Sequence, residues 1–555
     1  MYTNKDLADL IFPDINKTIE DYEKLYPKRD LPLGAEVTRF APSPTGFLHT
    51  GSLFTSMISQ KVANQSNGIF YVRLEDTDTK REIQGSGKEL IDQLALFGVI
   101  PDEGYLGDEE KGQYGPYKQS QRADIYKTVI KHLIEIGRAY PCFCTPKDLE
   151  ALREEQEKRK EITGYYGEYA KCKNLSLEEQ IARIKAGEKY VIRFKSLGDH
   201  NNKVEVDDLI RGHLSLTEND QDIVILKSDG LPTYHFAHLC DDHFMRTTIV
   251  TRGEEWLPSL PIHLDLFKAL GFKAPKYAHL PVIMKMDNGT RRKLSKRKDM
   301  EASVDYFLQS GYEPHALLVY LMTIANSNYE DYIVKTKDYN IDNFKLSFKK
   351  MSLDGALFDN DKLNFYSKEI LGKMDKNEIS KKAYEWAKIY SKELQEFIEK
   401  DYDKFVEIMN IEREKKNPRK DYAKYSDIYP IISFFDNKVY DKSIKETSFD
   451  LNPRISKDII KNFLIDYSKS NYALESDENC WFNNVKEVAS KYNFCTDNKI
   501  YKQDPTIWNG NINDACEILR LAFVLRKVTP NLFSIMKILG NEECTSRINL
   551  FIAPL

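Results

Sequence analysis

Hydrophobic positions between residues 35 and 74 follow two different periods. Residues 35–41 form a short apolar run typical of a buried strand, and residues 53–62 place apolar side chains at helical spacing. Gly68 ends this predicted helix, and residues 69–74 form a second apolar run. A strand, a loop, a helix and a strand within roughly 40 residues predict a βαβ unit and therefore a parallel sheet.

The same alternation returns in the middle of the chain. Residues 247–252 are typical of a strand and residues 257–270 of a helix. We therefore expect residues 228–275 to complete the sheet that residues 35–113 begin. The more mixed residues 114–227 are then an insertion between the two halves of an α/β, Rossmann-type catalytic domain.

The two ends of the chain have their own patterns. Residues 1–34 are polar and interrupted by prolines, which predicts an N-terminal extension. After about residue 370, long segments rich in Lys, Glu and Tyr have helical periodicity and few glycines, so residues 371–555 are predicted to be all-helical. No repeat of solenoid length is present.

Composition narrows the class of protein. A chain of 555 residues is too long for one hydrophobic core, and its net charge of -5 gives no overall basic excess, although a large enzyme needs only a local basic face to bind nucleic acid. The absence of an 18-residue apolar run and of a basic, apolar leader argues against a membrane span and a secretory signal. Eight sparsely spaced cysteines suggest a reducing cytoplasm.

The segment from Pro42 to Ser52 predicts a phosphate site. A turn follows the first strand and leads into a helix, whose N-terminal N–H groups attract anions at the carboxyl end of a parallel strand. His49 could donate a hydrogen bond there, and Gly51 would let a ligand approach the backbone. Taken alone, the tripeptide also fits an ordinary loop histidine before a helix.

The segment 288–299 contains six cations among residues 291–298. A solvated basic loop is the ordinary interpretation of such a run. Leu294 and Ser295 between lysines, after a glycine turn, instead favour a loop that closes over polyphosphate, where an ammonium group can stabilise a transferring phosphoryl group. A substrate that brings its own carboxylate needs only alignment and charge neutralisation.

Two other segments are weaker candidates. Residues 85–90 resemble the end of a P-loop but lack its first glycine and have Glu89 where a hydroxyl must reach magnesium, which indicates an ordinary helix start. The histidines and Cys240 in residues 235–243 have helical spacing, which favours a pocket wall over a zinc site.

Taken together, these motifs resemble the class I aminoacyl-tRNA synthetases. The tripeptide at His49 resembles their HIGH signature, and KLSKR, beginning at Lys293, resembles their KMSKS loop. The flanking segments TRFAPSPTG, RLEDTD, YKQSQR, LKSDGLPTYHFAH, DDHFMR and TRGEEW are similar to the glutamate–tRNA ligase family, and TPNLFSIMKILG resembles its C-terminal end more weakly.

The resemblance implies a two-step reaction. Glutamate and ATP, which enters with Mg²⁺, would give glutamyl-adenylate and pyrophosphate, and the glutamyl group would pass to the terminal adenosine of tRNA(Glu). It also implies that residues 276–370 contact the tRNA stem, that the insertion holds the acceptor end, and that the helical domain binds the anticodon. The enzyme would be monomeric and cytoplasmic. No DNA partner is implied.

The resemblance assigns site residues by matching motifs. His49, Gly51, Lys296 and Lys293 would be catalytic. The ATP site would comprise Thr45, Gly46, His49, Gly51, Ser52, Glu255, Trp256, Leu294, Ser295, Lys296 and Arg297. The glutamate site would comprise Arg39, Ala41, Ser43, Glu75, Tyr234, His238 and Arg252, with Glu75 on the substrate ammonium. His238 departs from the asparagine that many members have.

Arg252 is the residue that we expect to select glutamate over glutamine. A carboxylate in a partly dry pocket needs a cation, and a guanidinium offers it a bidentate partner. An ion pair of Arg252 with Glu254 or Glu255 is the purely structural alternative.

Cys142, Cys144 and Cys172 resemble a zinc site found in the inserted domain of some family members, with Tyr166 or Tyr169 as a fourth ligand. Three unliganded thiols are the alternative.

Other functions remain open at this stage. The sequence leaves open a non-discriminating enzyme that also charges tRNA(Gln), a glutamine-charging relative, a short paralogue that modifies a tRNA base, and an inactive tRNA-binding scaffold. Arg252 argues against the glutamine-charging relative, the long helical region against the paralogue, and the intact His49, Gly51 and Lys296 against the scaffold.

Overall fold

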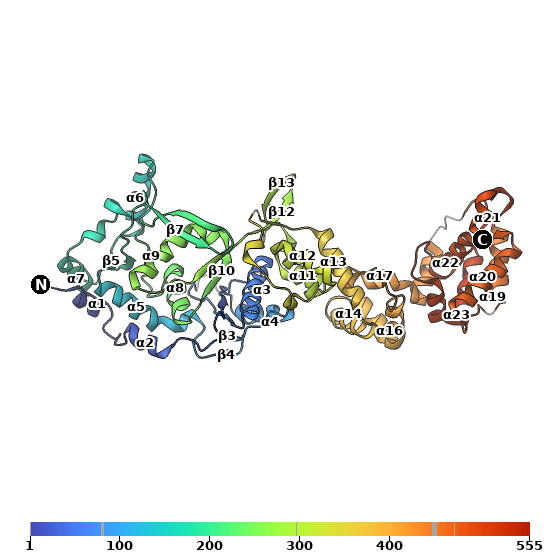
Figure 1. Ribbon diagram of the computed structural model, residues 1–555, viewed down its shortest axis with the longest axis horizontal. Coiled ribbons are helices and arrows are strands. Elements are labelled where there is room, and N and C mark those ends of the chain that lie inside the picture. Colours follow the sequence, from blue (N-terminus) through green and yellow to red (C-terminus); the bar gives the residue numbers. More distant parts are fainter. Residues whose placement is uncertain (1, 79–82, 296, 354, 447–451, 471) are drawn as a thin grey trace. The chain divides into compact units, whose positions relative to one another are not determined.

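The computed structural model (Figure 1) describes residues 2–78, 83–295, 297–353, 355–446, 452–470 and 472–555. The chain divides into two compact units. Unit 1 comprises Met1–Phe307 and Leu317–Asn360, and unit 2 comprises Leu308–Ala316 and Asp361–Leu555. The predicted catalytic domain and insertion both lie in unit 1. The predicted stem-contact region, residues 276–370, is divided between the two units.

The predicted βαβ unit is present at the start of unit 1. Strand β1 (Val37–Phe40) pairs in parallel with β2 (Ile69–Val72), and α3 (Thr50–Gln65) connects them. Gly68 passes so close to Glu36 that a Cβ atom would lie 1.9 Å from the Glu36 carbonyl oxygen, so only glycine fits where the chain turns into β2. The sheet continues through α4 (Ser86–Leu96) to β3 (Glu103–Tyr105), parallel to β2, and the antiparallel edge strand β4 (Glu110–Lys111).

A second sheet lies beside the first, but only one of its strands comes from within residues 228–275; two strands come from the predicted insertion and one from beyond residue 275. Its strands are β10 (Ile249–Gly253) and β11 (Lys276–Leu280), which are parallel, and the hairpin β7 (Lys203–Asp208) and β8 (Gly212–Thr217), in the order β10-β11-β7-β8. The backbone N–H of Thr248 donates to the Val37 carbonyl oxygen at 2.9 Å, which places β10 next to β1. Helix α8 (Tyr234–Phe244) precedes β10, and the 3₁₀ helix η4 (Glu254–Ser259) with α9 (Leu260–Leu270) connects β10 to β11.

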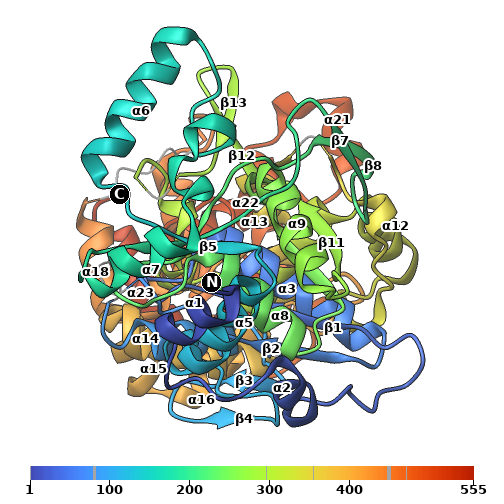
Figure 2. The same ribbon diagram turned by 90° about the vertical axis from the view of Figure 1, so that its left-hand side faces the viewer.

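The rest of the insertion forms a separate antiparallel sheet with helices around it. Its sheet contains β5 (Ala139–Cys142), β6 (Val191–Phe194) and β9 (Val224–Leu226). The helices are α5 (Ala123–Glu135), α6 (Pro146–Arg159) and α7 (Leu177–Lys185), with 3₁₀ turns η1 (Gln119–Arg122), η2 (Gly167–Tyr169) and η3 (Lys171–Asn174). Figure 2 shows α6 standing away from the other helices of the insertion.

The N-terminal extension is a packed part of unit 1. It forms α1 (Asn4–Ile11) and α2 (Ile19–Leu25), each with a capping box at its N-terminus. Helix α1 contacts α5 and α7 of the insertion, while Tyr22 and Tyr26 are buried against Phe244 of α8. Tyr22 and Tyr26 alone, in a polar segment, did not form a hydrophobic pattern from which this packing could be predicted.

Beyond the second sheet, unit 1 contains a three-stranded sheet and short helices. The hairpin β12 (Ile283–Asp287) and β13 (Thr290–Lys293) turns at Asn288 and Gly289, which both have positive φ, as a two-residue hairpin turn requires. Strand β14 (Ala356–Leu357) pairs in parallel with β12. The helices that follow β13 are η5 (Met300–Ala302), α10 (Val304–Ser310), α11 (Pro314–Ala325), α12 (Ser327–Thr336), η6 (Ile341–Asn343) and η7 (Phe348–Lys350). The end of α10 and the start of α11, residues 308–316, belong to unit 2.

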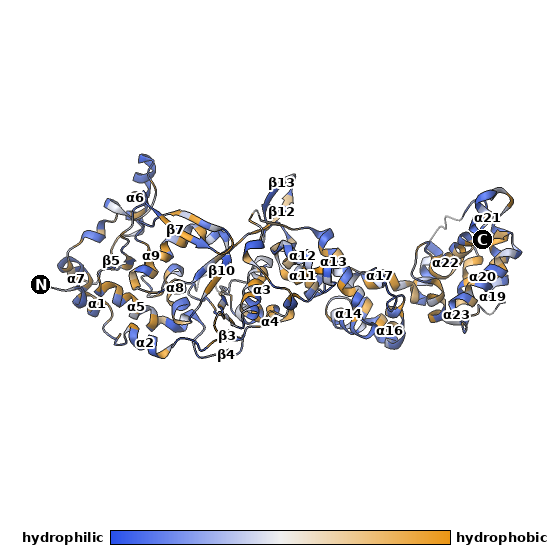
Figure 3. Cartoon of the chain, viewed as in Figure 1, coloured by the Kyte–Doolittle hydropathy of each residue, from blue (hydrophilic) through white to orange (hydrophobic). Residues whose placement is uncertain are grey.

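Unit 2 is helical, with one departure from the prediction. The residues 494–495 and 510–511 form two short parallel strands, β15 (Phe494–Cys495) and β16 (Gly510–Asn511). Figure 3 shows hydrophilic and hydrophobic positions alternating along the helices, as expected of helices that bury one face. These helices are α13 (Asn360–Lys373), α14 (Lys376–Tyr390), α15 (Lys392–Lys400), α16 (Tyr402–Asn410), α17 (Ile428–Ile432), α18 (Asn437–Glu446), α19 (Lys457–Ser468), α20 (Glu478–Lys491), α21 (Asn498–Gln503), α22 (Ile512–Val524) and α23 (Leu532–Ile552), with 3₁₀ turns η8 (Tyr425–Asp427), η9 (Ser433–Phe435) and η10 (Pro505–Ile507).

Among the described residues, no helix combines the length and the apolar character needed to cross a lipid bilayer.

Candidate active site

A cavity of about 470 Å³ lies in unit 1, where the carboxyl ends of β1 and β10 meet the N-terminus of α3 and the end of β13. Ligands of open α/β sheets bind at such carboxyl ends, where neighbouring connections leave the sheet in opposite directions. Twelve of the predicted site residues line this cavity: Arg39, Ala41, His49, Gly51, Ser52, Glu75, Tyr234, Arg252, Glu255, Trp256, Lys293 and Leu294.

The other predicted site residues that the structure describes lie outside its wall. Lys296 falls outside the described residues, so its position is not described. The predicted site residues that are described but do not line the cavity are Ser43, Thr45, Gly46, His238, Ser295 and Arg297.

The histidine and glycine of the HIGH-like motif act together at the start of α3. His49 is the N-cap residue, and its Nδ1 accepts the Gly51 backbone N–H at 2.9 Å. Because Nδ1 is the acceptor, the proton of a neutral imidazole lies on Nε2, which is then a donor at the cavity. A Cβ atom at position 51 would lie 3.2 Å from His49 Nδ1, so glycine gives the imidazole the room for this cap.

The KLSKR segment is anchored at both sides of its undescribed lysine. Leu294 is buried, and its N–H donates to the Ile283 carbonyl oxygen at 2.9 Å. Asp299 binds the Arg292 guanidinium through two hydrogen bonds of 2.6 and 2.8 Å and accepts the Ser295 N–H at 2.8 Å. The hydrogen bonds from Arg292 hold the pKa of Asp299 well below its usual range. The base of the loop is therefore fixed by a bidentate ion pair.

Lys293 and Glu255 form an exposed ion pair at the cavity wall, with Nζ 3.2 Å from Oε1. The pair joins the KLSKR segment to η4. Because both side chains are about half exposed, this ion pair contributes little to stability.

Arg252 is a buried cation without a carboxylate partner among the described residues. Its Nε donates to His279 at 3.0 Å, its Nη1 lies 3.2 Å from His263 Nδ1, and its Nη2 has no hydrogen-bond partner in the described part of the chain. The structural alternative of an ion pair with a neighbouring glutamate is wrong: Glu254 pairs with Arg211, and Glu255 with Lys293. Burial lowers the pKa of Arg252, because the charged form lacks an anion to compensate for lost water.

Glu75 and Arg39 lie over a buried network of charges. Glu75 Oε1 accepts from Arg73 Nη2 at 3.0 Å, and Arg73 Nη1 donates to Asp242 at 2.7 Å. Arg39 Nε donates to the same Asp242 oxygen at 3.4 Å. Burial raises the pKa of Glu75 in spite of the opposing effect of Arg73 and Arg39, so an arriving cation would favour its ionised form.

His238 is fully buried behind the cavity wall. Its Nδ1 lies 3.1 Å from Asp242 Oδ2, and its ring stacks on that of Tyr234 at a centroid distance of 5.3 Å. Burial lowers its pKa to about 4, so the imidazole is neutral at pH 7. His238 therefore supports Tyr234 from behind, whereas Tyr234 itself lines the cavity.

Sequence reasoning missed the residues that surround Arg252. Asp208, His263 and His279 come from β7, α9 and β11, three elements far apart in the sequence. The available signal was a histidine within a largely apolar segment, at positions 263 and 279, whereas Asp208 in the charged segment KVEVDD gave none.

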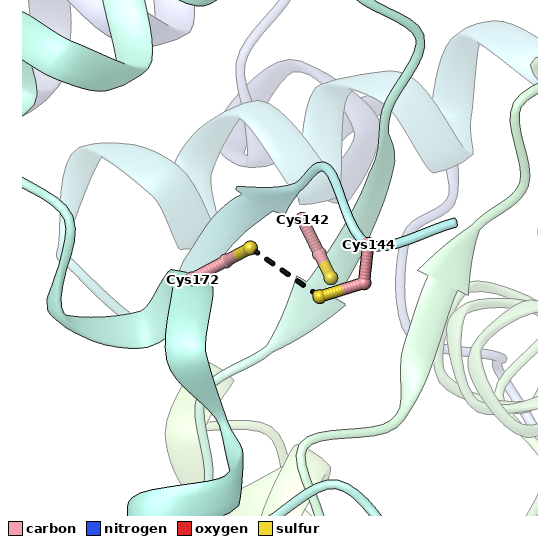
Figure 4. A group of neighbouring side chains, drawn as sticks. All are labelled: Cys142, Cys144 and Cys172. Atoms are coloured by element: carbon pink, nitrogen blue, oxygen red, sulfur yellow. Dashed lines mark hydrogen bonds between the residues drawn. The ribbon is translucent and has the colours of Figure 1, made fainter. Parts of the chain in front are cut away.

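Cys142, Cys144 and Cys172 form a cluster in the insertion (Figure 4). Their sulfur atoms lie within 4.8 Å of one another, with 3.7 Å between Cys144 and Cys172. Tetrahedral zinc with Zn–S bonds near 2.3 Å separates its sulfur ligands by about 3.8 Å. Hydrogen bonds from Cys144 and Cys172 lower the pKa of the Cys142 thiol, which favours the thiolate that a metal needs.

The fourth group of the cluster is Tyr165, and not either of the predicted tyrosines. The Tyr165 hydroxyl oxygen lies 3.4 Å from Cys142 Sγ and 3.3 Å from Cys144 Sγ. Tyr166 instead donates to the Ile162 carbonyl oxygen, and Tyr169 donates to Glu161. The donor set, three thiols and one phenol, fits a tetrahedral metal ion.

Comparison with known proteins decides the family. Residues 36–365 match the model of the class I tRNA synthetases (E and Q), catalytic domain. A glutamate–tRNA ligase of Clostridium perfringens is 47% identical over 552 residues, which cover 99% of each chain. The chain belongs to the glutamate–tRNA ligase family. A second member, from Acetivibrio thermocellus, is 44% identical over 98% of this chain and 99% of its own.

A solved member of the glutamate–tRNA ligase family has the same fold. The crystal structure of the glutamate tRNA ligase from Elizabethkingia meningosepticum in complex with its amino acid is 27% identical and covers 93% of this chain and 99% of its own, with a TM-score of 0.73. The family match at residues 36–365 contains every residue that lines the cavity, and the relatives extend over unit 2 as well.

Proposed function

We propose that this chain activates L-glutamate with ATP and transfers the glutamyl group to the 3′ end of tRNA(Glu), as an AMP- and diphosphate-forming ligase. The observation that carries the proposal is the buried, uncompensated guanidinium of Arg252 in a cavity that the His49 cap also lines. Glutamyl-adenylate, which has a carboxylate at one end and a phosphate group next to the other, satisfies both.

The glutamate would lie between Arg252 and Glu75. Its side-chain carboxylate would accept from the unpaired Nη2 of Arg252, and its ammonium group would pair with Glu75. Arg39 and Tyr234 would complete the pocket, with Ala41 as a small wall residue. An uncharged glutamine amide would leave the guanidinium uncompensated, which disfavours the glutamine-charging alternative.

ATP would lie against the N-terminus of α3. The Nε2–H of His49 and the N–H groups of the first helical turn would bind phosphate, and Gly51 and Ser52 would border the adenosine with Trp256. Lys293 would leave Glu255 for the triphosphate, and Lys296 is proposed from its motif to neutralise the transferring α-phosphate. Bound Mg²⁺ would supply further neutralisation of the β- and γ-phosphates.

The chemistry needs no nucleophilic side chain. The α-carboxylate of glutamate attacks the α-phosphorus atom, pyrophosphate leaves, and a ribose hydroxyl of the tRNA then attacks the acyl carbon and releases AMP. We further propose that the helical residues 371–555 read the anticodon, that the enzyme is a monomer, and that it works in the cytoplasm, where its substrates are.

The decisive experiment is glutamate-dependent exchange of pyrophosphate into ATP, measured with and without tRNA(Glu), together with formation of glutamyl-tRNA. We expect glutamylation to depend on glutamate, ATP and tRNA(Glu), and glutamine to be a poor substitute. Pure chain that binds tRNA but supports neither exchange nor glutamylation would contradict the proposal and favour a binding scaffold.

We also propose that Cys142, Cys144, Cys172 and Tyr165 hold a structural Zn²⁺ ion. The support is the donor set and its spacing. The ion would stabilise the insertion by joining the end of β5 to η3, and none of the three cysteines lines the active-site cavity.

A further inference from the structure

The guanidinium of Arg252 has three edges, and two of them are occupied by imidazoles. Nε donates to His279 Nε2 at 3.0 Å, and Nη1 donates to His263 Nδ1 at 3.2 Å. Only Nη2 is unpaired among the described residues. The two imidazoles therefore decide which nitrogen of Arg252 remains for a ligand.

An arginine can only donate hydrogen bonds, so both contacting imidazole nitrogens must be free of protons. In each histidine, the second nitrogen is held as the donor. His279 Nδ1 donates to Asp208 Oδ2 at 2.7 Å, and His263 Nε2 donates to His235 Nδ1 at 3.0 Å. The far contact of each ring thus selects the tautomer that Arg252 needs.

Neutral acceptors also leave the positive charge of Arg252 intact. Burial lowers the pKa of His263 and of His279, which keeps both rings neutral at pH 7. Asp208, the carboxylate in the hydrogen-bonded series Asp208–His279–Arg252, is separated from Arg252 by the imidazole of His279. A carboxylate in direct contact would have neutralised the guanidinium and removed its affinity for an anionic ligand.

Asp208 is itself fixed in position. Its Oδ1 accepts the backbone N–H groups of Ile210 and Arg211 at 3.0 and 2.9 Å, and its Oδ2 accepts the N–H of His279 at 3.1 Å. Because Asp208 is the last residue of β7, the hairpin of the predicted insertion reaches the specificity residue of the catalytic sheet through this aspartate.

We propose that Asp208 and His279 are positioning residues that set the affinity for the side-chain carboxylate of glutamate, and its selection over glutamine, by holding Arg252 with Nη2 toward the ligand. This inference rests on the proposed function. It predicts that damage to the Asp208–His279–Arg252 chain affects the use of glutamate and leaves the use of ATP nearly unchanged.

The test is the kinetics of glutamylation by the full-length chain. We expect His279→Ala to raise the KM for glutamate at least about tenfold and to change the KM for ATP less than about twofold, since one hydrogen bond to a charged group is lost. His279→Gln places an amide oxygen near the position of Nε2 and should restore most of the loss. Asp208→Asn can donate to Nδ1 and so favour the wrong tautomer, and it should fall between the two.

The matched control is Asp207→Asn, one residue earlier on β7, where the carboxylate pairs with the exposed His213. It should behave as wild type. An unchanged KM for glutamate in His279→Ala, an equal rise of both KM values, or no rescue by glutamine would overturn the inference. If the wild type itself does not glutamylate tRNA, it is the proposed function that fails.

A measurement on the wild type covers the case in which His279→Ala does not fold. NMR of the chain labelled with ¹⁵N-histidine distinguishes the two tautomers, and the His279→Gln variant identifies the signal of residue 279. We expect a neutral ring with its proton on Nδ1. A proton on Nε2 would overturn the inference.

Discussion

At the scale of single residues, Arg252 combines burial, a retained positive charge and one nitrogen that no described residue pairs with. A buried charge that loses its partner costs about 2–5 kcal/mol. Removal of the Arg252 cation would leave the bound glutamate carboxylate without its partner, at that cost. We expect Arg252→Gln to lower kcat/KM for glutamate by at least about 30-fold and to bring the ratio of glutamate to glutamine use close to one.

The measurement for Arg252 is competition between the two amino acids in the aminoacylation assay. Arg211→Gln is the control, because it removes an arginine that pairs with Glu254 and does not line the cavity. A glutamate-to-glutamine ratio that stays as in the wild type would contradict the role of Arg252.

His49 has two separable tasks, and substitution can divide them. His49→Asn keeps an N-cap acceptor for the Gly51 N–H but lacks the Nε2 donor, whereas His49→Ala loses both. We expect both variants to lower the rate of adenylate formation by about 10²–10³-fold, and only the alanine variant to lower stability, by about 1 kcal/mol.

Pyrophosphate exchange and urea unfolding together check this prediction. Near-normal exchange in His49→Asn would mean that the imidazole is a helix cap alone.

The residues found from sequence and those missed differ in how local their signal is. His49 and Gly51 lie two positions apart, and their cap is a contact within one turn, so the sequence motif contains the whole interaction. The contact of Arg252 with His263 spans 11 residues and that of His279 with Asp208 spans 71. The local sequence around each of these residues does not indicate its partner. The prediction named Tyr166 or Tyr169 in place of Tyr165, because the sequence of an irregular turn does not determine which way neighbouring side chains point.

At the scale of elements, periodicity predicted the regular parts well. The β1–α3–β2 unit, the β10 strand and the helix α9 follow the apolar pattern, because their burial is one-sided or complete over several residues. Periodicity did not predict helices α1 and α2, because both segments are short and mostly polar and their contacts come from distant elements.

The packing of α2 leads to a stability prediction. Tyr22 is 3% exposed and packs between Tyr26 and Phe244, so Tyr22→Ala should remove about 3–5 kcal/mol from the free energy of unfolding of unit 1. Tyr2→Ala, at a tyrosine that is 43% exposed, is the control and should cost less than about 1 kcal/mol. Chemical unfolding followed by tyrosine and tryptophan fluorescence measures both; equal effects would show that α2 is not anchored through Tyr22.

The thiol cluster gives a prediction for the insertion. Purified chain should contain close to one zinc ion, and Cys144→Ser should reduce the zinc content and make the insertion more sensitive to protease. Cys480→Ser, at an exposed cysteine of unit 2, should retain the metal. Elemental analysis that finds well under one zinc ion in the wild type would leave the three thiols unliganded.

At the scale of the whole molecule, the chain contains two compact units, and the cavity lies entirely within unit 1. Ligand binding stabilises only the part of a protein that forms the site. We expect calorimetry to resolve more than one transition, and glutamate at 100 times its Kd to stabilise unit 1 by about 2.7 kcal/mol, which raises its Tm by about 2–4 °C.

The transition of unit 2 should not move with glutamate. Glu313→Gln provides a marker for it, because buried Glu313 accepts from the Tyr425 hydroxyl and pairs with Lys382 within unit 2. A single transition that shifts as a whole with glutamate would contradict independent units.

The wall of the cavity begins at Arg39 and ends at Leu294, which lie 255 positions apart in the chain. A ribosome that adds about 5–20 residues per second needs roughly 13–50 s to travel this distance. Free glutamate in the cell therefore cannot stabilise the nascent polypeptide during that interval, and the first half of the sheet must survive without its substrate until translation has passed the KLSKR segment.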